Sequence, residues 1–237
     1  MAAESPPGIS PPPPAPSSKI KITTTLPTRP LPPNAQRAPI LTPRLVIRPF
    51  APTDLDGIHA LRSQPEVMQW TSVGRPDRDR AETQAFMDRY LPPNEGRSYD
   101  FVMCDRATGR VLGTGGMHKM ECLELGWPEV GYMFRKEAWG RGLATEFLTA
   151  WTEAWWALPR SVVEVEVDAD SVAGLEAGPG TQLPEMVSAM AESNNPGSIR
   201  VLEKAGFRSF KTWKEPDSRP GFENLDVELI GFALQRP

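Results

Sequence analysis

A glycine-punctuated turn between a predicted strand and a predicted helix is the clearest chemical feature of this 237-residue chain. The turn spans Trp139 to Ala144, after a strand-like run over 129–135 and before a helix-like run that ends near Leu158. Backbone N–H groups point outward at such a corner, and the positive end of the helix dipole adds to them. Glycine also lets a ligand approach the backbone closely. The corner therefore suits a phosphate, or better a pyrophosphate.

The elements that must position this corner follow a Pro-rich N-terminal segment. Residues 1–40 hold many prolines, which lack an N–H and fix φ, so we expect a disordered, partly polyproline II tail there. The folded domain is expected to span residues 41–237. Within it, residues 169–186 are rich in Gly, Pro and Ala and fit no regular element, so we interpret them as an insertion loop.

Hydrophobic periodicity and turn signals divide the domain into alternating strands and helices. Helices are predicted at 55–62, 79–90, 143–158 and 195–205. Strands are predicted at 44–50, 99–104, 111–118, 129–135, 161–167, 207–213 and 226–234, and residues 187–191 are interpreted as resuming the strand that the insertion after 161–167 interrupts. The strand over 161–167 is expected to lie parallel to the strand over 129–135, joined to it by a right-handed crossover.

Three segments, in this order, carry a family resemblance. They are Leu41 to Phe50, Val130 to Tyr132 together with Trp139 to Glu146, and Asn195 to Phe207. The chain resembles the GNAT superfamily of acyl-CoA-dependent N-acetyltransferases, and within it the branch of ribosomal-protein N-terminal acetyltransferases (RimJ/RimL type). The resemblance covers about residues 41–234. It implies an α/β (α+β) fold with a mixed, mostly antiparallel sheet of six to seven strands, about four flanking helices and splayed central strands.

The resemblance implies acetyl-CoA as cosubstrate and no metal. The turn would hold the pyrophosphate, and the preceding strand would pair with the peptide-like pantetheine arm as an added strand. Trp139 either contacts the ligand or packs at the rim, and Asn195 either bonds pantetheine or only caps a helix. The residues expected to contact CoA are Met133, Phe134, Arg135, Trp139, Gly140, Arg141, Gly142, Leu143, Ala144, Thr145 and Asn195.

Acyl transfer to an amine needs a base for the amine, a donor for the developing oxyanion and stabilisation of the leaving thiolate. Glu129 is the expected base, with an exposed strand-end acid as the alternative; the amide of Phe134 is the expected oxyanion donor. In many family members a Tyr late in the third segment acts as the general acid, and this chain has Leu202 at that position. Ser198 takes the position of a hydroxyl near the thiol sulfur, unless it only caps the helix. His118 ends a strand that faces the acceptor side, although a lone His is more often structural.

Composition excludes several classes of protein. A net charge of −4 argues against a nucleic-acid binder, and no run of about 18 apolar residues predicts a membrane span. Two cysteines, Cys104 and Cys122, make no disulfide framework, and with two histidines in unrelated segments they argue against structural zinc. We therefore expect a cytoplasmic protein, with the nucleus as an alternative, that is a monomer or homodimer.

The leading functional hypothesis is an N-acetyltransferase that moves an acetyl group from acetyl-CoA to a primary amine by direct attack in a ternary complex. The resemblance points to a protein N-terminus as the acceptor. A small-molecule amine is one alternative, and a catalytically silent acyl-CoA-binding or scaffold module is another. A dinucleotide-binding oxidoreductase is set aside, because the glycine turn comes too late in the chain and lacks a third Gly.

Overall fold

The computed structural model describes residues 18–120, 124–175, 181–222 and 225–237. Its helices are α1 Leu55–Arg62, α2 Pro65–Met68, α3 Arg80–Met87, α4 Leu143–Trp156 and α5 Pro196–Lys204. Its strands are β1 Lys19–Pro27, β2 Ile40–Leu41, β3 Leu45–Arg48, β4 Tyr99–Asp105, β5 Val111–Lys119, β6 Glu129–Phe134, β7 Arg160–Asp168, β8 Met186–Glu192, β9 Arg208–Pro216 and β10 Asp226–Gln235.

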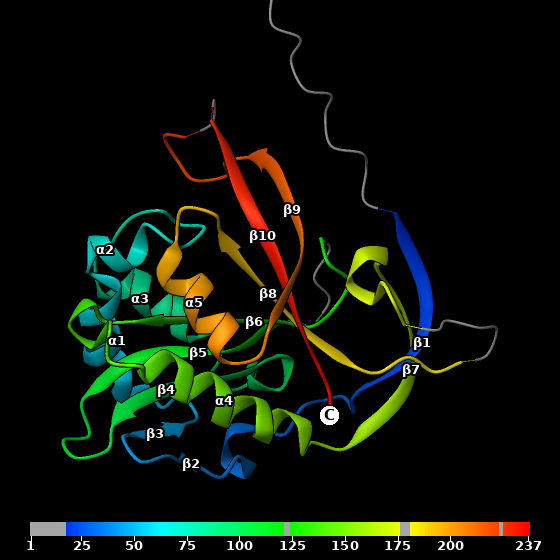
Figure 1. Ribbon diagram of the computed structural model, residues 1–237. Coiled ribbons are helices and arrows are strands. Elements are labelled where there is room, and N and C mark those ends of the chain that lie inside the picture. Colours follow the sequence, from blue (N-terminus) through cyan, green and yellow to red (C-terminus); the bar gives the residue numbers. More distant parts are fainter. Residues whose placement is uncertain (1–17, 121–123, 176–180, 223–224) are drawn as a thin grey trace, which may run out of the picture.

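A single eight-stranded sheet forms the centre of the molecule, in the order β2-β3-β4-β5-β6-β8-β10-β9 (Figure 1). Every neighbouring pair is antiparallel except β6 and β8, which run parallel. The predicted mixed, mostly antiparallel α/β fold is confirmed, with one strand more than expected. Four of the five helices were predicted; the four-residue α2 was not.

Helices cover both faces of the sheet, and β4 shows how its residues divide between them. Tyr99, Phe101 and Met103 belong to the large core cluster that also holds the α4 side chains. The alternate residues Val102 and Cys104 belong to a second cluster, with α1 and α3. Because successive side chains of a strand point to opposite faces, this assigns one face to α4 and α5 and the other to α1 and α3.

The parallel pair of strands is open over most of its length. Only Glu129 of β6 and Ser188 of β8 are registered partners, although the strands have six and seven residues. Beyond that point the two strands diverge toward Phe134 and Glu192. The central sheet therefore contains a wedge-shaped gap whose closed end lies at Glu129.

The prediction of a disordered tail up to residue 40 is wrong for residues 18–40; residues 1–17 lie outside the described part. β1 pairs with β7 in antiparallel register along its whole length. Ile22 and Leu31 are buried, and the buried Arg37 donates to the backbone carbonyls of Glu95 and Ser98. Proline prevents regular structure only at and near its own position. No proline lies between residues 17 and 26, so β1 can form there.

The prediction that strand 161–167 lies parallel to β6 is also wrong. This strand is β7, which forms a separate two-stranded sheet with β1, and β8 takes the place beside β6 (Figure 1). Burial explains the difference. Residues 186–189 of β8 are all buried, as a central strand requires, whereas residues 160–166 of β7 are all exposed or half-buried.

The described parts of the insertion, residues 169–175 and 181–186, pack against the β1–β7 sheet. Val172 and Leu183 join Ile22, Trp127 and other side chains in a third apolar cluster. This region lies on the right in Figure 1, whereas α1, α2 and α3 lie on the left. Outside residues 176–180, which the structure does not describe, the insertion therefore does not border the face of the sheet that α1 covers. Among the described residues, no helix has both the length and the apolarity needed to cross a bilayer.

Candidate functional site

The glycine corner has the open backbone that the sequence predicts. Gly140 and Gly142 have φ values of 72° and 76°, in the left-handed region that favours glycine. A Cβ placed on Gly140 would meet nothing within 4 Å, and one on Gly142 would meet only the Arg44 guanidinium, at 3.5 Å. The corner is thus accessible from outside, and Gly142 is the residue from which α4 begins.

Amides at the start of α4 are free of helical partners. The first helical hydrogen bond in this turn runs from Glu146 N to the Gly142 carbonyl. The N–H groups of Leu143, Ala144 and Thr145 precede it, so the helix itself provides no acceptor for them. Together with the helix dipole they make an anion-binding corner.

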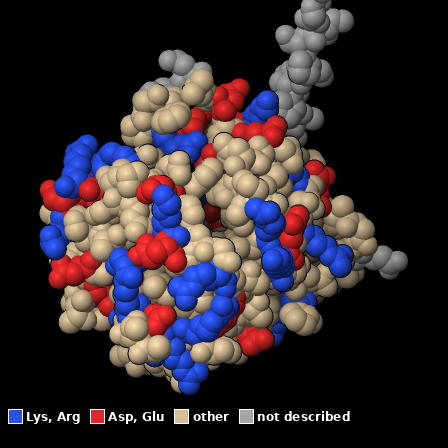
Figure 2. Space-filling model, turned by 60° about the vertical axis from the view of Figure 1, so that its left-hand side comes forward, with Lys and Arg blue, Asp and Glu red and all other residues tan. Residues whose placement is uncertain are grey.

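The first segment of the family resemblance braces this corner. Arg44 Nε lies 2.6 Å from a carboxylate oxygen of Glu146, and Arg44 Nη1 donates to the Arg141 carbonyl at 2.7 Å. Thr42 Oγ1 donates to the other oxygen of Glu146 at 2.6 Å. Figure 2 shows that Lys and Arg side chains gather over the lower part of one face of the molecule. Sequence reasoning recognised the segment but did not assign Arg44 this role.

Trp139 lies at the rim of the corner. Its indole Nε1 donates to the Phe134 carbonyl at 2.7 Å, while 43% of the residue stays exposed. This contact matches the rim-packing alternative and leaves part of the ring open to a ligand.

The edge of β6 that faces the gap offers the Phe134 amide. Arg135 N donates to Leu112 O on β5, so the alternation of the ladder turns the N–H of Phe134 the other way, toward the gap. Met133, by the same alternation, turns its backbone to β5, and its side chain packs beneath α1 and α3. The Arg135 guanidinium donates to Gly57 O in α1. The structure therefore brings Phe134 to the gap, but not Met133 or Arg135.

A tyrosine hydroxyl lies beside Ser198, and it comes from Tyr132 on β6. The position where many family members carry a Tyr as general acid holds Leu202 in this chain. The Tyr132 hydroxyl is 3.1 Å from Ser198 Oγ, on the α4–α5 side of the sheet. Burial raises the pKa of Tyr132 to about 12, so its phenol is protonated at neutral pH. Asn195 caps α5, with Oδ1 accepting from Ser198 N at 3.0 Å. The sequence analysis did not assign this hydroxyl a role; the signal for it was the Tyr132 in the strand that precedes the glycine corner.

Glu129 is buried at the closed end of the gap, so the alternative of an exposed strand-end acid is wrong. Only 6% of the residue is exposed. His118 Nε2 lies 3.4 Å from one carboxylate oxygen and Lys119 Nζ 3.3 Å from the other. By strand alternation Glu129 lies on the face that α1 and α3 cover, opposite to Tyr132. The gap thus has hydroxyl groups on one face and a carboxylate on the other.

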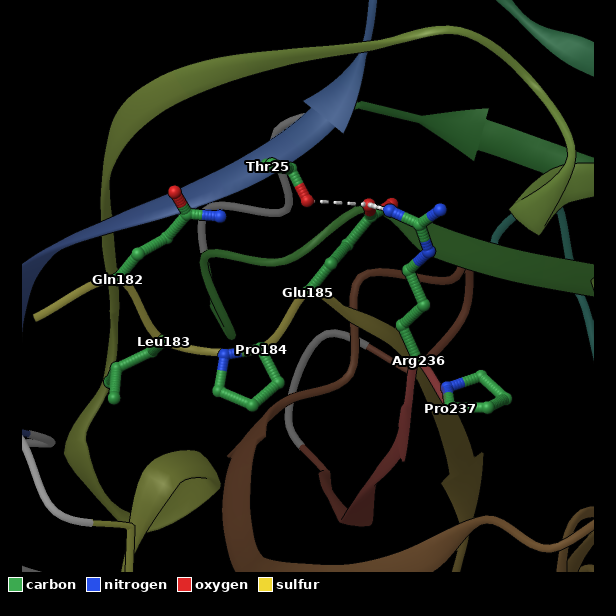
Figure 3. Close-up of a pocket in the computed structure, with 7 residues that line it drawn as sticks. All are labelled: Thr25, Gln182, Leu183, Pro184, Glu185, Arg236 and Pro237. Carbon is green, nitrogen blue, oxygen red and sulfur yellow. Dashed lines mark hydrogen bonds and ion pairs between the residues drawn. The ribbon is translucent and has the colours of Figure 1, made fainter.

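A separate cavity of about 310 Å³ lies beside β1 and the C-terminal end of the chain (Figure 3). Glu185 points into it and accepts from Thr25 Oγ1 and from Arg160 Nε, at 3.3 and 2.7 Å. Arg236 extends toward the same carboxylate. The charge of Glu185 is therefore already balanced by two arginines, and none of the predicted site residues lines this cavity. Within the described ranges, no group of three His, Cys, Asp or Glu side chains gathers to hold a metal ion.

Comparison with known proteins identifies the fold. The sequence model of the acetyltransferase (GNAT) domain family matches residues 44–208, which is more than half of the chain. No curated protein matches the sequence.

Solved structures of similar fold include three informative relatives. A GNAT-family acetyltransferase from Bacillus anthracis is 20% identical, covers 84% of this chain and 98% of its own, and has a TM-score of 0.59. RimJ from Mycobacterium smegmatis in complex with CoA-disulfide is 17% identical, covers 81% of each chain and has a TM-score of 0.59. A spermidine N-acetyltransferase from Vibrio cholerae in complex with CoA and spermine is 14% identical, covers 82% and 96%, and has a TM-score of 0.57. At these identities the likeness is one of fold.

Proposed function

This chain belongs to the GNAT acetyltransferase family, and on that premise we propose that it acetylates the N-terminal amine of a protein. The chain is an acetyl-CoA-dependent N-acetyltransferase; the identity of the acceptor is the proposal. The observation that supports acetyl transfer to an amine is the gap between β6 and β8, which has the glycine corner at its open end and the buried Glu129 at its closed end.

The residues present fit acetyl-CoA, whose thioester supplies an activated acetyl group. The open corner at Gly140 and Gly142, with the amides at the start of α4, suits the pyrophosphate. Between the corner and Glu129, the gap-facing backbone edge of β6 suits the amides of the pantetheine arm, as in the addition of a strand to a sheet. The Phe134 carbonyl on that edge already accepts from Trp139 Nε1. Arg141 is exposed beside the corner and adds positive charge.

The proposed reaction uses groups from both faces of the sheet. Glu129 accepts the proton that the acceptor amine must lose before it attacks. The N–H of Phe134 donates to the carbonyl oxygen as negative charge develops on it. Ser198, held by Tyr132, donates a hydrogen bond to the leaving thiolate. This hydroxyl pair compensates for the Leu at position 202, which would otherwise favour a silent CoA-binding module.

The resemblance to the RimJ/RimL branch supports a protein N-terminus as the acceptor. A small-molecule amine is the second candidate, because a polyamine carries more positive charge than a protein N-terminus and the buried carboxylates Asp100 and Glu129 would attract it more strongly. We propose a cytoplasmic location for either function, with the protein acting as a monomer or homodimer.

One experiment separates these functions. The protein is incubated with labelled acetyl-CoA and with N-terminal peptides, polyamines or aminoglycosides, and the transfer of label is followed. Transfer to peptides alone supports the N-terminal acetyltransferase, and transfer to polyamines or aminoglycosides supports the second candidate. Thermal stabilisation by CoA without transfer to any amine indicates the silent module.

A further inference from the structure

We propose that Glu129 works as part of a proton relay, in which Glu129 and His118 take a proton from the acceptor ammonium and release it to solvent through His118, while the negative charge of Asp100 stabilises the protonated imidazole. The inference rests on the proposed acetyltransferase function and deepens it. It assigns a role to His118 on β5, the neighbour of β6, and to Asp100 on β4, the next strand of the sheet.

All three residues lie at the same end of one face of the sheet. Asp100 on β4 has the alternation of Val102 and Cys104, which pack beneath α1 and α3. Asp100 is the cross-strand partner of Gly116 on β5, and Gly116 is in turn the partner of Gly131 on β6. The three strands therefore bring the relay together although 29 residues of sequence separate its ends.

A glycine makes room for the imidazole. A Cβ on Gly131 would lie 2.7 Å from His118 Cε1, so any larger residue there would displace the ring. The ring lies over the backbone of β6, where its Nε2 comes within 3.4 Å of the Glu129 carboxylate. The family resemblance includes Gly131, and this packing is a physical reason for a glycine in that position of this chain.

Exposure gives the relay a direction. Glu129 and Asp100 are 6% and 5% exposed, whereas the His118 side chain is 31% exposed. A proton taken up at the buried carboxylate can therefore reach water through the imidazole.

Charged and titratable side chains from several elements surround Asp100, His118 and Glu129. Lys119 on β5 pairs with Glu129, and Arg37 and Arg89 lie near Asp100, as does the phenol of Tyr90. Burial acts to lower the pKa of His118, but the Glu129 and Asp100 carboxylates outweigh it and raise the pKa overall. Burial raises the pKa of Asp100 to about 6. The raised pKa of His118 makes its imidazole a better proton acceptor for the carboxylate beside it.

The proton balance of the step is complete. The ammonium group loses one proton to Glu129 and His118, and its freed lone pair forms the C–N bond with the thioester carbonyl carbon. The C–S bond then breaks, and the second proton that the nitrogen loses neutralises the thiolate. The net reaction gives the amide, CoA thiol and one proton, which leaves through His118.

The kinetic test compares two amines of similar shape. Ethylamine is an ammonium ion at neutral pH and needs the relay, whereas trifluoroethylamine is already neutral. His118→Gln is expected to lower kcat/KM for ethylamine on the order of 10²-fold and to change that for trifluoroethylamine little. Asp100→Asn removes a negative charge near His118, so the rising limb of the pH profile is expected to move to lower pH.

The second test follows the imidazole directly by NMR. The chain has only two histidines, so His59→Gln assigns both signals and serves as the control that leaves the pH profile unchanged. The pKa of His118 is expected to fall in Glu129→Gln and in Asp100→Asn. It is expected to stay unchanged in Glu164→Gln, which alters an exposed acid on β7.

Two results would overturn the relay: an unchanged His118 titration in both carboxylate variants, or an equal loss of both amine activities in His118→Gln. If the wild-type protein binds CoA but acetylates neither amine and none of the acceptor panel, the proposed function fails and the catalytic role of the relay fails with it. The titration would still show whether the three groups are coupled, so the two failures are distinguishable.

Discussion

The hydroxyl oxygen of Tyr132 lies 3.1 Å from Ser198 Oγ, which links β6 to the first turn of α5. This pair joins the strand on one side of the gap to the helix that follows the strand on its other side. It presents hydroxyl groups on the α4–α5 face, while Glu129 lies on the opposite face. The proposed donor to the thiolate and the proposed base thus lie on opposite faces of the sheet, and the gap between β6 and β8 connects them.

Tyr132→Phe tests the hydroxyl pair. With a pKa of about 12 the phenol donates a hydrogen bond rather than a full proton, so we expect kcat to fall about 10-fold, which corresponds to roughly 1.4 kcal/mol. CoA affinity should change little, because the backbone edge of β6 stays intact. Steady-state kinetics and calorimetry measure both quantities. Tyr99→Phe, beneath α4, is the control, and an unchanged kcat in Tyr132→Phe would remove this residue from the mechanism.

Gly142→Asp tests the glycine corner. The substitution places a negative charge against the pyrophosphate and a side chain at a φ of 76°, so CoA affinity should fall at least about 10-fold. Gly174→Asp is the matched control, because Gly174 has a φ of 84° and open space around it. Each variant should lose about 1–2 kcal/mol of stability to backbone strain. Equal CoA affinities in the two variants would place the pyrophosphate elsewhere.

Ile22→Ala tests the role of the N-terminal strand. Ile22 is buried with Trp127 and Val167, so its truncation should lower the free energy of unfolding by about 2–4 kcal/mol. Lys21→Ala, at the adjacent exposed position, should change it by less than about 0.5 kcal/mol. Urea denaturation measures the difference. Similar values for both variants would mean that β1 contributes little to the fold.

Asp100→Asn tests the buried carboxyl through the pH dependence of stability. A pKa raised to about 6 means that the folded state holds the Asp100 proton more tightly than the unfolded state does. Its contribution is therefore fully present below about pH 4 and is lost as the pH rises through 6, on the order of 2–3 kcal/mol in total. Between pH 4 and pH 7 the free energy of unfolding of the wild type should therefore fall by about 2–3 kcal/mol more than that of Asp100→Asn, as measured by urea denaturation. Parallel curves would contradict the raised pKa.

Local features of the chain could be read from the sequence. The corner at Gly140 and Gly142 was predictable because glycine is required for left-handed backbone and because helix starts leave free amides. The cap at Asn195 and the left-handed Gly206 after α5 follow from the same local rules. These properties depend on a few adjacent residues, so no distant contact has to be known.

The pairing of the strands could not be predicted from the sequence. The strands over 161–167 and 187–191 both carry β-branched residues, and only the burial of β8 on both sides shows which one lies beside β6. Likewise the prolines of the N-terminal segment concealed a strand, because β1 becomes stable only when Ile22 can pack against Trp127.

The sequence by itself determined the donor side of this protein: a glycine corner, a helix start and a strand edge in the order typical of an acetyl-CoA site. The tertiary structure alone decided the partners of the reacting groups, since Tyr132 meets Ser198 across 66 residues and His118 meets Glu129 across a strand pair. The physical reason is the range of the forces involved. Backbone preferences act within a few residues, whereas side-chain partners depend on which strands bury their surfaces against each other.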